Sequence, residues 1–311
     1  MPLPECERCV KPPGNPTAVR CRPKGVQRRT FLTVIVGLPV LGTAASLLAA
    51  CGDATEPGGT TAPPTPPTVP HPTGADEAVL RITYSGGFVP FGYQFRQVPM
   101  LLVSGDGRAF LPAPQPAIYP GALLPAVNVR PIDEVAVQTL LSLARTEGLL
   151  ATPPDYSLPP GIGIADAPDT VVEVHANGTV YLHSANALGM DGTSTSARDA
   201  LQRFVEGASS LDATVGAAHL GTESPFVADE YRFVAMPVDP AGYTTEPLPT
   251  IVDWPTSTGV VLADADQCAT ASDASVGELF RGANELTFFR EGDVVYQLWV
   301  GPVLPGDAAC G

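Results

Sequence analysis

Apolar and polar positions divide the chain into three zones. A predominantly apolar run covers residues 31–50, and residues 52–75 then hold Val69 as the one large apolar side chain among Pro, Thr and Gly. From about Asp76 onwards, short apolar stretches alternate with turn residues. This pattern predicts an export or membrane segment over residues 1–50, an extended spacer over residues 51–75 and a folded body over residues 76–311.

The first half of the body has the pattern of β-hairpins. Residues 79–84 and 99–103 alternate as strands do, and the turn at 105–107 leads into a third strand at 108–111. Asn177-Gly178, between apolar stretches at 170–176 and 179–184, is the strongest short hairpin signal in the chain. Residues 112–130 contain five prolines and predict an irregular crossing.

Three segments have helical spacing. Pro131 at a predicted start and Gly148 just past the end bracket the first helix, and Ser196 is the predicted cap of the second. A third, shorter helix is predicted near residues 276–281, among strands at 231–235 and 251–254 and a last hairpin over 285–300. Hairpins interleaved with about three helices predict an α+β fold with mostly antiparallel sheets. A proline-rich segment near 237–249 is the predicted internal boundary.

The first helix is expected to bury Ile132, Val135, Ala136, Leu140, Leu143 and Ala144.

The charge is unevenly distributed. Of the 17 basic and 32 acidic residues, seven and two precede Cys51, which leaves the remainder of the chain with a net charge near −20 and no lysine. So acidic a body repels phosphate backbones, and this argues against nucleic-acid binding. Abundant Ala, Gly, Pro, Val and Arg without lysine is typical of a GC-rich genome, as in an actinobacterium.

The apolar run has the three parts of a secretory signal: a basic start, an apolar middle and small residues before a cut. Arg-Arg-x-Phe-Leu resembles the twin-arginine export motif, and Leu-Ala-Ala-Cys resembles the lipobox. Over residues 26–51 the chain therefore resembles bacterial twin-arginine-exported lipoproteins of unknown function. The resemblance implies a diacylated cysteine that anchors the protein in the bilayer, on the extracytoplasmic face of the cell membrane. The residues that carry it are Arg28, Arg29, Phe31, Leu32, Leu48, Ala49, Ala50 and Cys51.

Two other interpretations of the N-terminal region fit the sequence less well. Twenty apolar residues could span a bilayer, but Pro39 and nearby glycines weaken such a helix and would leave Cys51 unexplained. Cys6 and Cys9 suggest a zinc knuckle, but a second ligand pair at suitable spacing is missing. Since valine can be encoded by a bacterial start codon, we expect translation to begin at Val26.

After Cys51, the remaining cysteines are Cys268 and Cys310. An even pair in an exported protein predicts a structural disulfide, which here closes a loop of about 43 residues. A redox or metal pair would need closer spacing or additional histidines.

Candidate chemistry is sparse in the body. His175 and His183 share the hairpin around Asn177-Gly178, but its register places them on opposite faces, so they are not expected to bind one metal ion. His71 in the spacer and His219 in a Gly/Ala-rich loop are expected to lie in solvent. No sequence motif marks a catalytic serine, and the pattern indicates no metal and no cofactor.

Acidic residues leave two alternatives open. Asp166 and Asp169 precede a predicted strand and could act as a catalytic pair, although helix or turn capping explains them better. Asp264, Asp266 and Asp273 resemble part of a calcium loop but lack its central glycine and closing glutamate.

Four aromatic residues cluster in a Gly/Pro loop after the first strand. Phe88, Phe91, Tyr93 and Phe95 could contact a glycan or a partner protein, or could cover the core. The favoured function is a non-catalytic, membrane-tethered binding or envelope-interaction module. The alternatives are a cell-wall or glycan hydrolase with two carboxylates, and a protein that acquires a cofactor before export.

Overall fold

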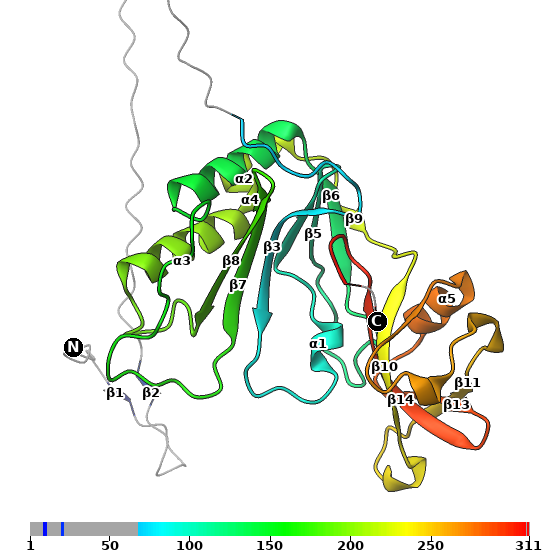
Figure 1. Ribbon diagram of the computed structural model, residues 1–311. Coiled ribbons are helices and arrows are strands. Elements are labelled where there is room, and N and C mark those ends of the chain that lie inside the picture. The colour runs from blue at the N-terminus through cyan, green and yellow to red at the C-terminus, as the bar shows by residue number, and fades with distance from the viewer. Residues whose placement is uncertain (1–8, 11–19, 22–67, 309, 311) are drawn as a thin grey trace, which may run out of the picture. The chain divides into compact units, whose positions relative to one another are not determined.

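Figure 1 shows the computed structural model, which describes residues 9–10, 20–21, 68–308 and 310. The chain divides into two compact units, residues 1–63 and 64–311. In the first unit, β1 (Cys9–Val10) pairs antiparallel with β2 (Arg20–Cys21). The predicted export signal, Cys51 and most of the spacer lie outside the described residues. No described helix is long and apolar enough to cross a membrane.

The second unit contains two sheets, of which the first has seven strands in the order β8-β7-β3-β4-β5-β6-β9. All neighbouring strands in this sheet are antiparallel. On the third strand of this order, β3, Leu80 and Ile82 are buried under the helices. The strands are β3 (Ala78–Ser85), β4 (Leu101–Ser104), β5 (Arg108–Pro112), β6 (Val127–Pro131), β7 (Asp169–Ala176), β8 (Thr179–Asn186) and β9 (Ser224–Pro225).

Three helices cover one face of this sheet: α2 (Glu134–Thr146), α3 (Ser196–Ser209) and the short α4 (Leu211–Val215) (Figure 1). Helix α2 begins three residues later than expected, because Pro131 is the last residue of β6 and Asp133 is the residue that caps the helix. Val135, expected in the core, is 53% exposed. Helix α3 is capped by Thr195, one residue before the predicted cap.

The second sheet has five strands in the order β11-β13-β14-β10-β12. Its neighbours are antiparallel except for β11 and β13, which are parallel. Helix α5 (Ala274–Gly282) packs Phe280 against Phe233 and Trp254 to form an aromatic core. The strands are β10 (Tyr231–Pro237), β11 (Thr250–Asp253), β12 (Ala269–Ala271), β13 (Thr287–Glu291) and β14 (Val294–Pro302).

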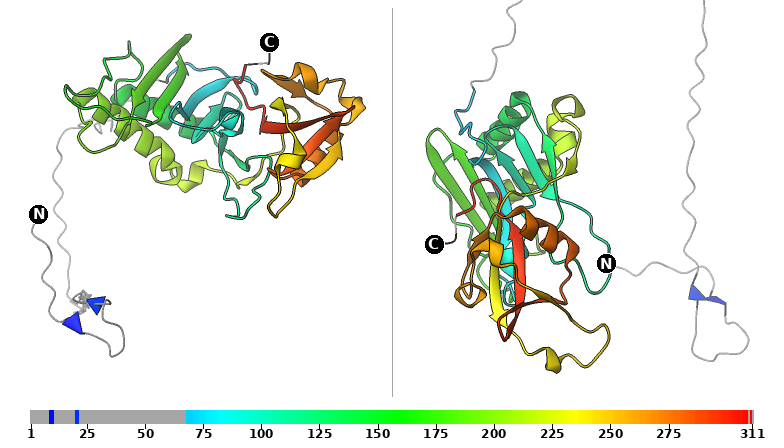
Figure 2. Two further views of the ribbon diagram at one scale, coloured as in Figure 1. Left: turned by 90° about the horizontal axis from the view of Figure 1, so that it is seen from below. Right: turned by 90° about the vertical axis from the view of Figure 1, so that its right-hand side faces the viewer.

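The predicted fold class is therefore confirmed: the structure is α+β, its sheets are mostly antiparallel, and a Cys268–Cys310 disulfide is formed. The chain passes from the first sheet to the second through residues 226–230, which lie between β9 and β10. The proline-rich segment at 237–249 connects β10 to β11 within the second sheet. The left view of Figure 2 shows the second sheet at the opposite end of this unit from β7, β8 and α3.

The last residues of the spacer are packed onto the first sheet. The side chain of Val69 is fully buried, and the Gln138 amide on α2 holds both of its backbone groups, at 2.7 Å from the nitrogen and 2.9 Å from the oxygen. The carbonyl of Pro70 accepts a hydrogen bond from the amide of Asn177 at 2.7 Å. The folded body therefore begins before Asp76. The buried side chain of Val69 and the backbone hydrogen bonds of Val69 and Pro70 attach these residues to α2 and to the β7–β8 turn.

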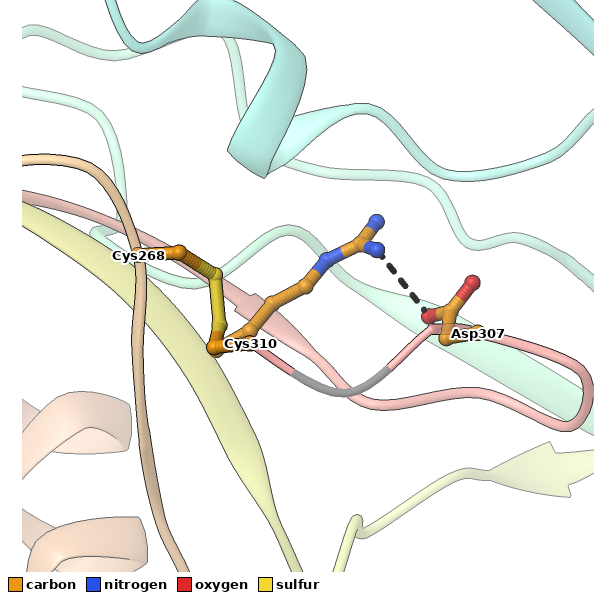
Figure 3. The surroundings of a disulfide bond; sticks show 4 residues. Cys268, Asp307 and Cys310 are labelled. Atoms are coloured by element: carbon orange, nitrogen blue, oxygen red, sulfur yellow. Dashed lines mark ion pairs between the residues drawn. A yellow bond between two sulfur atoms is a disulfide. The ribbon is translucent and has the colours of Figure 1, made fainter.

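The C-terminal segment joins the two sheets. The carboxylate of Asp307 is 2% exposed and contacts Arg81 of β3 at 2.6 Å and Arg232 of β10 at 3.4 Å. Three residues further on, Cys310 is linked to Cys268, with their Cα atoms 5.3 Å apart (Figure 3). The ion pairs and the disulfide together fasten the C-terminal segment across both sheets.

Candidate binding site

The aromatic loop after β3 is fixed to the second sheet. Its short helix α1 (Tyr93–Arg96) contacts β10 and β14. Gly92 has φ +75°, and a Cβ atom there would lie 2.3 Å from the ring of Trp299, so this close packing requires glycine. The ring of Phe91 packs edge-on against Trp299 with the centroids 5.4 Å apart. The loop is therefore positioned by the contacts of Phe91 and Gly92 with Trp299 of β14.

The structure separates the four aromatic residues that the sequence grouped. Phe91 and Phe95 contact the second sheet, the latter through its backbone carbonyl against Gly301. Phe88 is 90% exposed, and Tyr93 is about half exposed. The loop consequently covers part of the sheet and also leaves aromatic surface in contact with solvent.

Tyr93 lies at the rim of an aromatic pocket, which we define by Tyr93, Tyr119, Tyr243 and Trp299. The pocket has a volume of about 380 Å³ and lies between α1, the 119–123 segment, residues 285–286 just before β13, and strand β14. Tyr119 comes from the proline-rich crossing and Tyr243 from the β10–β11 connection. Four segments far apart in sequence therefore supply its rings, which is why the local aromatic cluster in the sequence pointed only to Tyr93 among them.

An ion pair between Arg96 and Glu285 forms the polar part of the pocket. Arg96 also donates to the carbonyl of Ala122 at 2.7 Å, and Glu285 accepts from the amide of Gly121 at 3.3 Å. Both charged side chains remain partly exposed. The pocket thus combines flat apolar rings with a guanidinium and a carboxylate held in fixed positions, and it can both stack against and hydrogen-bond to a ligand.

The candidate carboxylates for hydrolysis do not line this pocket. Asp169 accepts a hydrogen bond from Asn186 at 3.0 Å across the β7–β8 hairpin, and Asp166 is exposed in a left-handed turn with φ +61°. Hydrogen bonds lower the pKa of three described aspartates, Asp133, Asp155 and Asp273. A general acid needs a raised pKa, so these shifts run in the opposite direction.

Two of the three candidate calcium ligands lie at helix ends. Asp273 caps α5 by accepting from the amide and the hydroxyl of Ser275, both at 2.7 Å, and Asp264 ends a 3-10 helix, Leu262–Asp264. Within residues 68–308 and the other described positions, no group of three or more His, Cys, Asp or Glu side chains is arranged to hold a metal ion.

The predicted hairpin register is confirmed, because Ala176 pairs with Thr179 and His175 pairs with Val180. His183 is therefore buried on the core face, whereas His175 lies on the other face beside Glu173. Two histidines that were expected in solvent make ordered contacts. His71 is buried and lies 3.1 Å from Glu134, and His219 bonds to Asp133, the cap of α2, at 2.8 Å.

His183 belongs to a buried polar network. Its Nε2 lies 2.9 Å from the carbonyl of Leu149, which requires a proton on Nε2, so Nδ1 accepts the hydroxyl proton of Tyr156 at 2.8 Å. Burial lowers the pKa of His183 from its usual 6.5 and raises the pKa of Tyr156 to about 12. The network therefore holds a neutral imidazole.

We expect the protein to lose stability as the pH falls below about 6.5, the pKa of histidine in the unfolded chain. The unfolded chain binds a proton at His183 in this range while the folded protein does not, so acid favours unfolding by up to about 1.4 kcal/mol per pH unit. Urea unfolding at several pH values between 7 and 5 measures this slope. His183→Gln, which does not titrate, should flatten it, and equal slopes in both proteins would refute the assignment.

Fold and pocket together define the class: a two-sheet α+β body with a partly open aromatic pocket at the second sheet. Comparison of the chain with protein-family models, curated proteins and solved structures finds no match. A function is therefore inferred from the chemistry of the pocket.

Proposed function

We propose that the chain is a membrane-tethered extracytoplasmic lipoprotein, held by Cys51, whose body acts as a non-catalytic binding module for a glycan of the cell envelope. The observation that carries the proposal is the aromatic pocket with its Arg96–Glu285 pair. The apolar face of a sugar ring stacks on flat aromatic side chains, while its hydroxyl groups pair with charged, planar side chains.

The size and composition of the pocket support a small polar ligand. A volume of about 380 Å³ lies within the range of small-molecule sites. Glu285 is the one carboxylate among the described lining residues, whereas the rival glycan hydrolase needs two. The pocket is accordingly better suited to holding a sugar than to cleaving one.

Tryptophan fluorescence provides a direct test, because the chain has two tryptophans in different settings. Trp299 lines the pocket, whereas Trp254 is buried in the aromatic core and donates to the carbonyl of Val260. We expect at least one of three neutral probes, chitotriose, cellotriose or maltotriose, to change the Trp299 signal in a saturable way. Absence of any change up to roughly 10 mM would reject a glycan ligand.

Variants identify the surface that binds. Tyr119→Ala is expected to weaken binding about tenfold, since it removes one stacking face worth about 1.4 kcal/mol. Tyr84→Ala is the matched control, because Tyr84 is an exposed tyrosine that does not line the pocket. Equal losses in the two variants would place the glycan elsewhere.

A further inference from the structure

A second cavity lies on the other side of the proline-rich crossing. It has a volume of about 590 Å³ and is bounded by the 113–115 and 122–128 segments, residues 225–228, and parts of β10, α5 and β14. We call it the proline-lined cavity. Its apolar wall includes four prolines, which have no amide hydrogen to donate: Pro114, Pro125, Pro225 and Pro302. Such a wall favours hydrocarbon over a ligand that needs many hydrogen bonds.

Most polar side chains at this cavity already have partners in the protein. Gln115 donates to the carbonyl of Leu124 at 3.0 Å, and Asn128 donates to Glu223. The hydroxyl of Tyr231 accepts from Nη1 of Arg281 at 3.1 Å. Arg281 is the one cationic side chain among the described residues that line the cavity, and its described hydrogen bond is to the hydroxyl of Tyr231.

Arg281 differs in this respect from most arginines of the body. The described structure pairs the following arginines with carboxylates: Arg81, Arg96, Arg108, Arg130, Arg203, Arg232 and Arg290. Arg281 forms no ion pair with any carboxylate that the structure describes, although the body carries a net charge near −20. A guanidinium at the edge of an apolar cavity attracts an anionic head group.

The sequence of helix α5 leaves room for the contact between Tyr231 and Arg281. Gly277 lies one turn before Arg281, and a Cβ atom there would come within 3.0 Å of the Tyr231 ring and 3.2 Å of Nη1 of Arg281. Glycine inside a helix costs about 1 kcal/mol relative to alanine. Its place here leaves room for the phenol and the guanidinium to meet.

We propose that the proline-lined cavity binds a medium-chain fatty acid, with the carboxylate on Arg281 and the hydrocarbon along the proline wall. A single cation matches a single negative charge, whereas a polyanion would be repelled by the acidic body. The volume lies within the range of small-ligand sites. This site is separate from the aromatic pocket and does not depend on the proposed glycan.

Isothermal titration calorimetry of the full chain with dodecanoate tests the proposal. Arg281→Gln is expected to weaken binding tenfold or more, because it removes the charge-assisted contact. Arg290→Gln is the matched control, because Arg290 lies on β13 rather than on α5 and pairs with Asp253, outside the cavity. All variants share the apolar N-terminal run, so its nonspecific uptake of dodecanoate cancels in the comparison.

A second variant keeps the test independent of Arg281. Val227 lines the cavity and is 60% exposed, so Val227→Asp adds a negative charge to the cavity lining, which repels the carboxylate, with little risk to folding. It should weaken dodecanoate binding about tenfold, whereas Val180→Asp, at a similarly exposed valine on β8, should not.

Several results would overturn the proposal. The first is an absence of saturable dodecanoate binding. The second is equal affinity for dodecanoate in the wild type and Arg281→Gln, and the third is dodecylamine that binds as tightly as dodecanoate. Loss of dodecanoate binding in Tyr119→Ala with Arg281→Gln unaffected would move the fatty acid to the aromatic pocket and would equally refute this site.

Discussion

Replacing Cys268 and Cys310 together by alanine is expected to lower the free energy of unfolding by about 4 kcal/mol. The two cysteines are 42 residues apart, and opening the bridge restores the chain entropy of that loop to the unfolded state. It also releases the C-terminal segment that joins the sheets. Guanidinium unfolding followed by circular dichroism measures the loss.

Reduction of the native protein provides the control for this result. A reductant should lower the stability of the wild type by a similar amount and leave the double-alanine variant unchanged. Wild-type stability that does not respond to reductant, under conditions where thiol labelling shows Cys268 and Cys310 to be reduced, would contradict the prediction.

Asp307→Ala is expected to cost about 3 kcal/mol, the second large effect. The carboxylate is almost fully buried, and in addition to Arg81 and Arg232 it accepts from the amide of Leu304 at 2.9 Å. Its removal leaves two mostly buried guanidinium groups without their common anion. Urea unfolding at neutral pH measures the change.

An exposed ion pair supplies the comparison for Asp307. Asp253 pairs with Arg290 at 2.8 Å, but both side chains are largely in solvent, so Asp253→Ala should cost less than about 1 kcal/mol. Asp307→Asn should fall between the two, since the amide can still accept from Leu304 but carries no charge. Similar losses for Asp307→Ala and Asp253→Ala would show that burial does not strengthen the Asp307 contacts.

Local signals in the sequence predicted local structure well. Asn177-Gly178 fixed the register of β7 and β8, since a two-residue turn leaves one pairing, and apolar spacing located α3. The strand β6 was missed because five prolines made residues 112–130 look irregular, although Val127–Pro131 pairs with both β5 and β9. The parallel pairing of β11 with β13 depends on contacts far apart in sequence, which no local pattern encodes.

The candidate site was only partly predictable for the same reason. Tyr93 was found because it belongs to a local aromatic cluster. Tyr119, Tyr243 and Trp299 come from separate connections and strands, and only the tertiary fold brings them together. Gly92, next to two aromatic residues, was the one local sign of close packing. Burial of Val69 was also missed, since a lone valine among prolines carries no periodicity.

The direction of β3 has a consequence for where a bound ligand would be held. The docked spacer enters this strand near Ala78, and the aromatic loop leaves it after Ser85. Eight residues of strand span about 26 Å. On the proposed lipid anchor, the length of this strand would therefore add to the distance between the docked spacer and the aromatic loop.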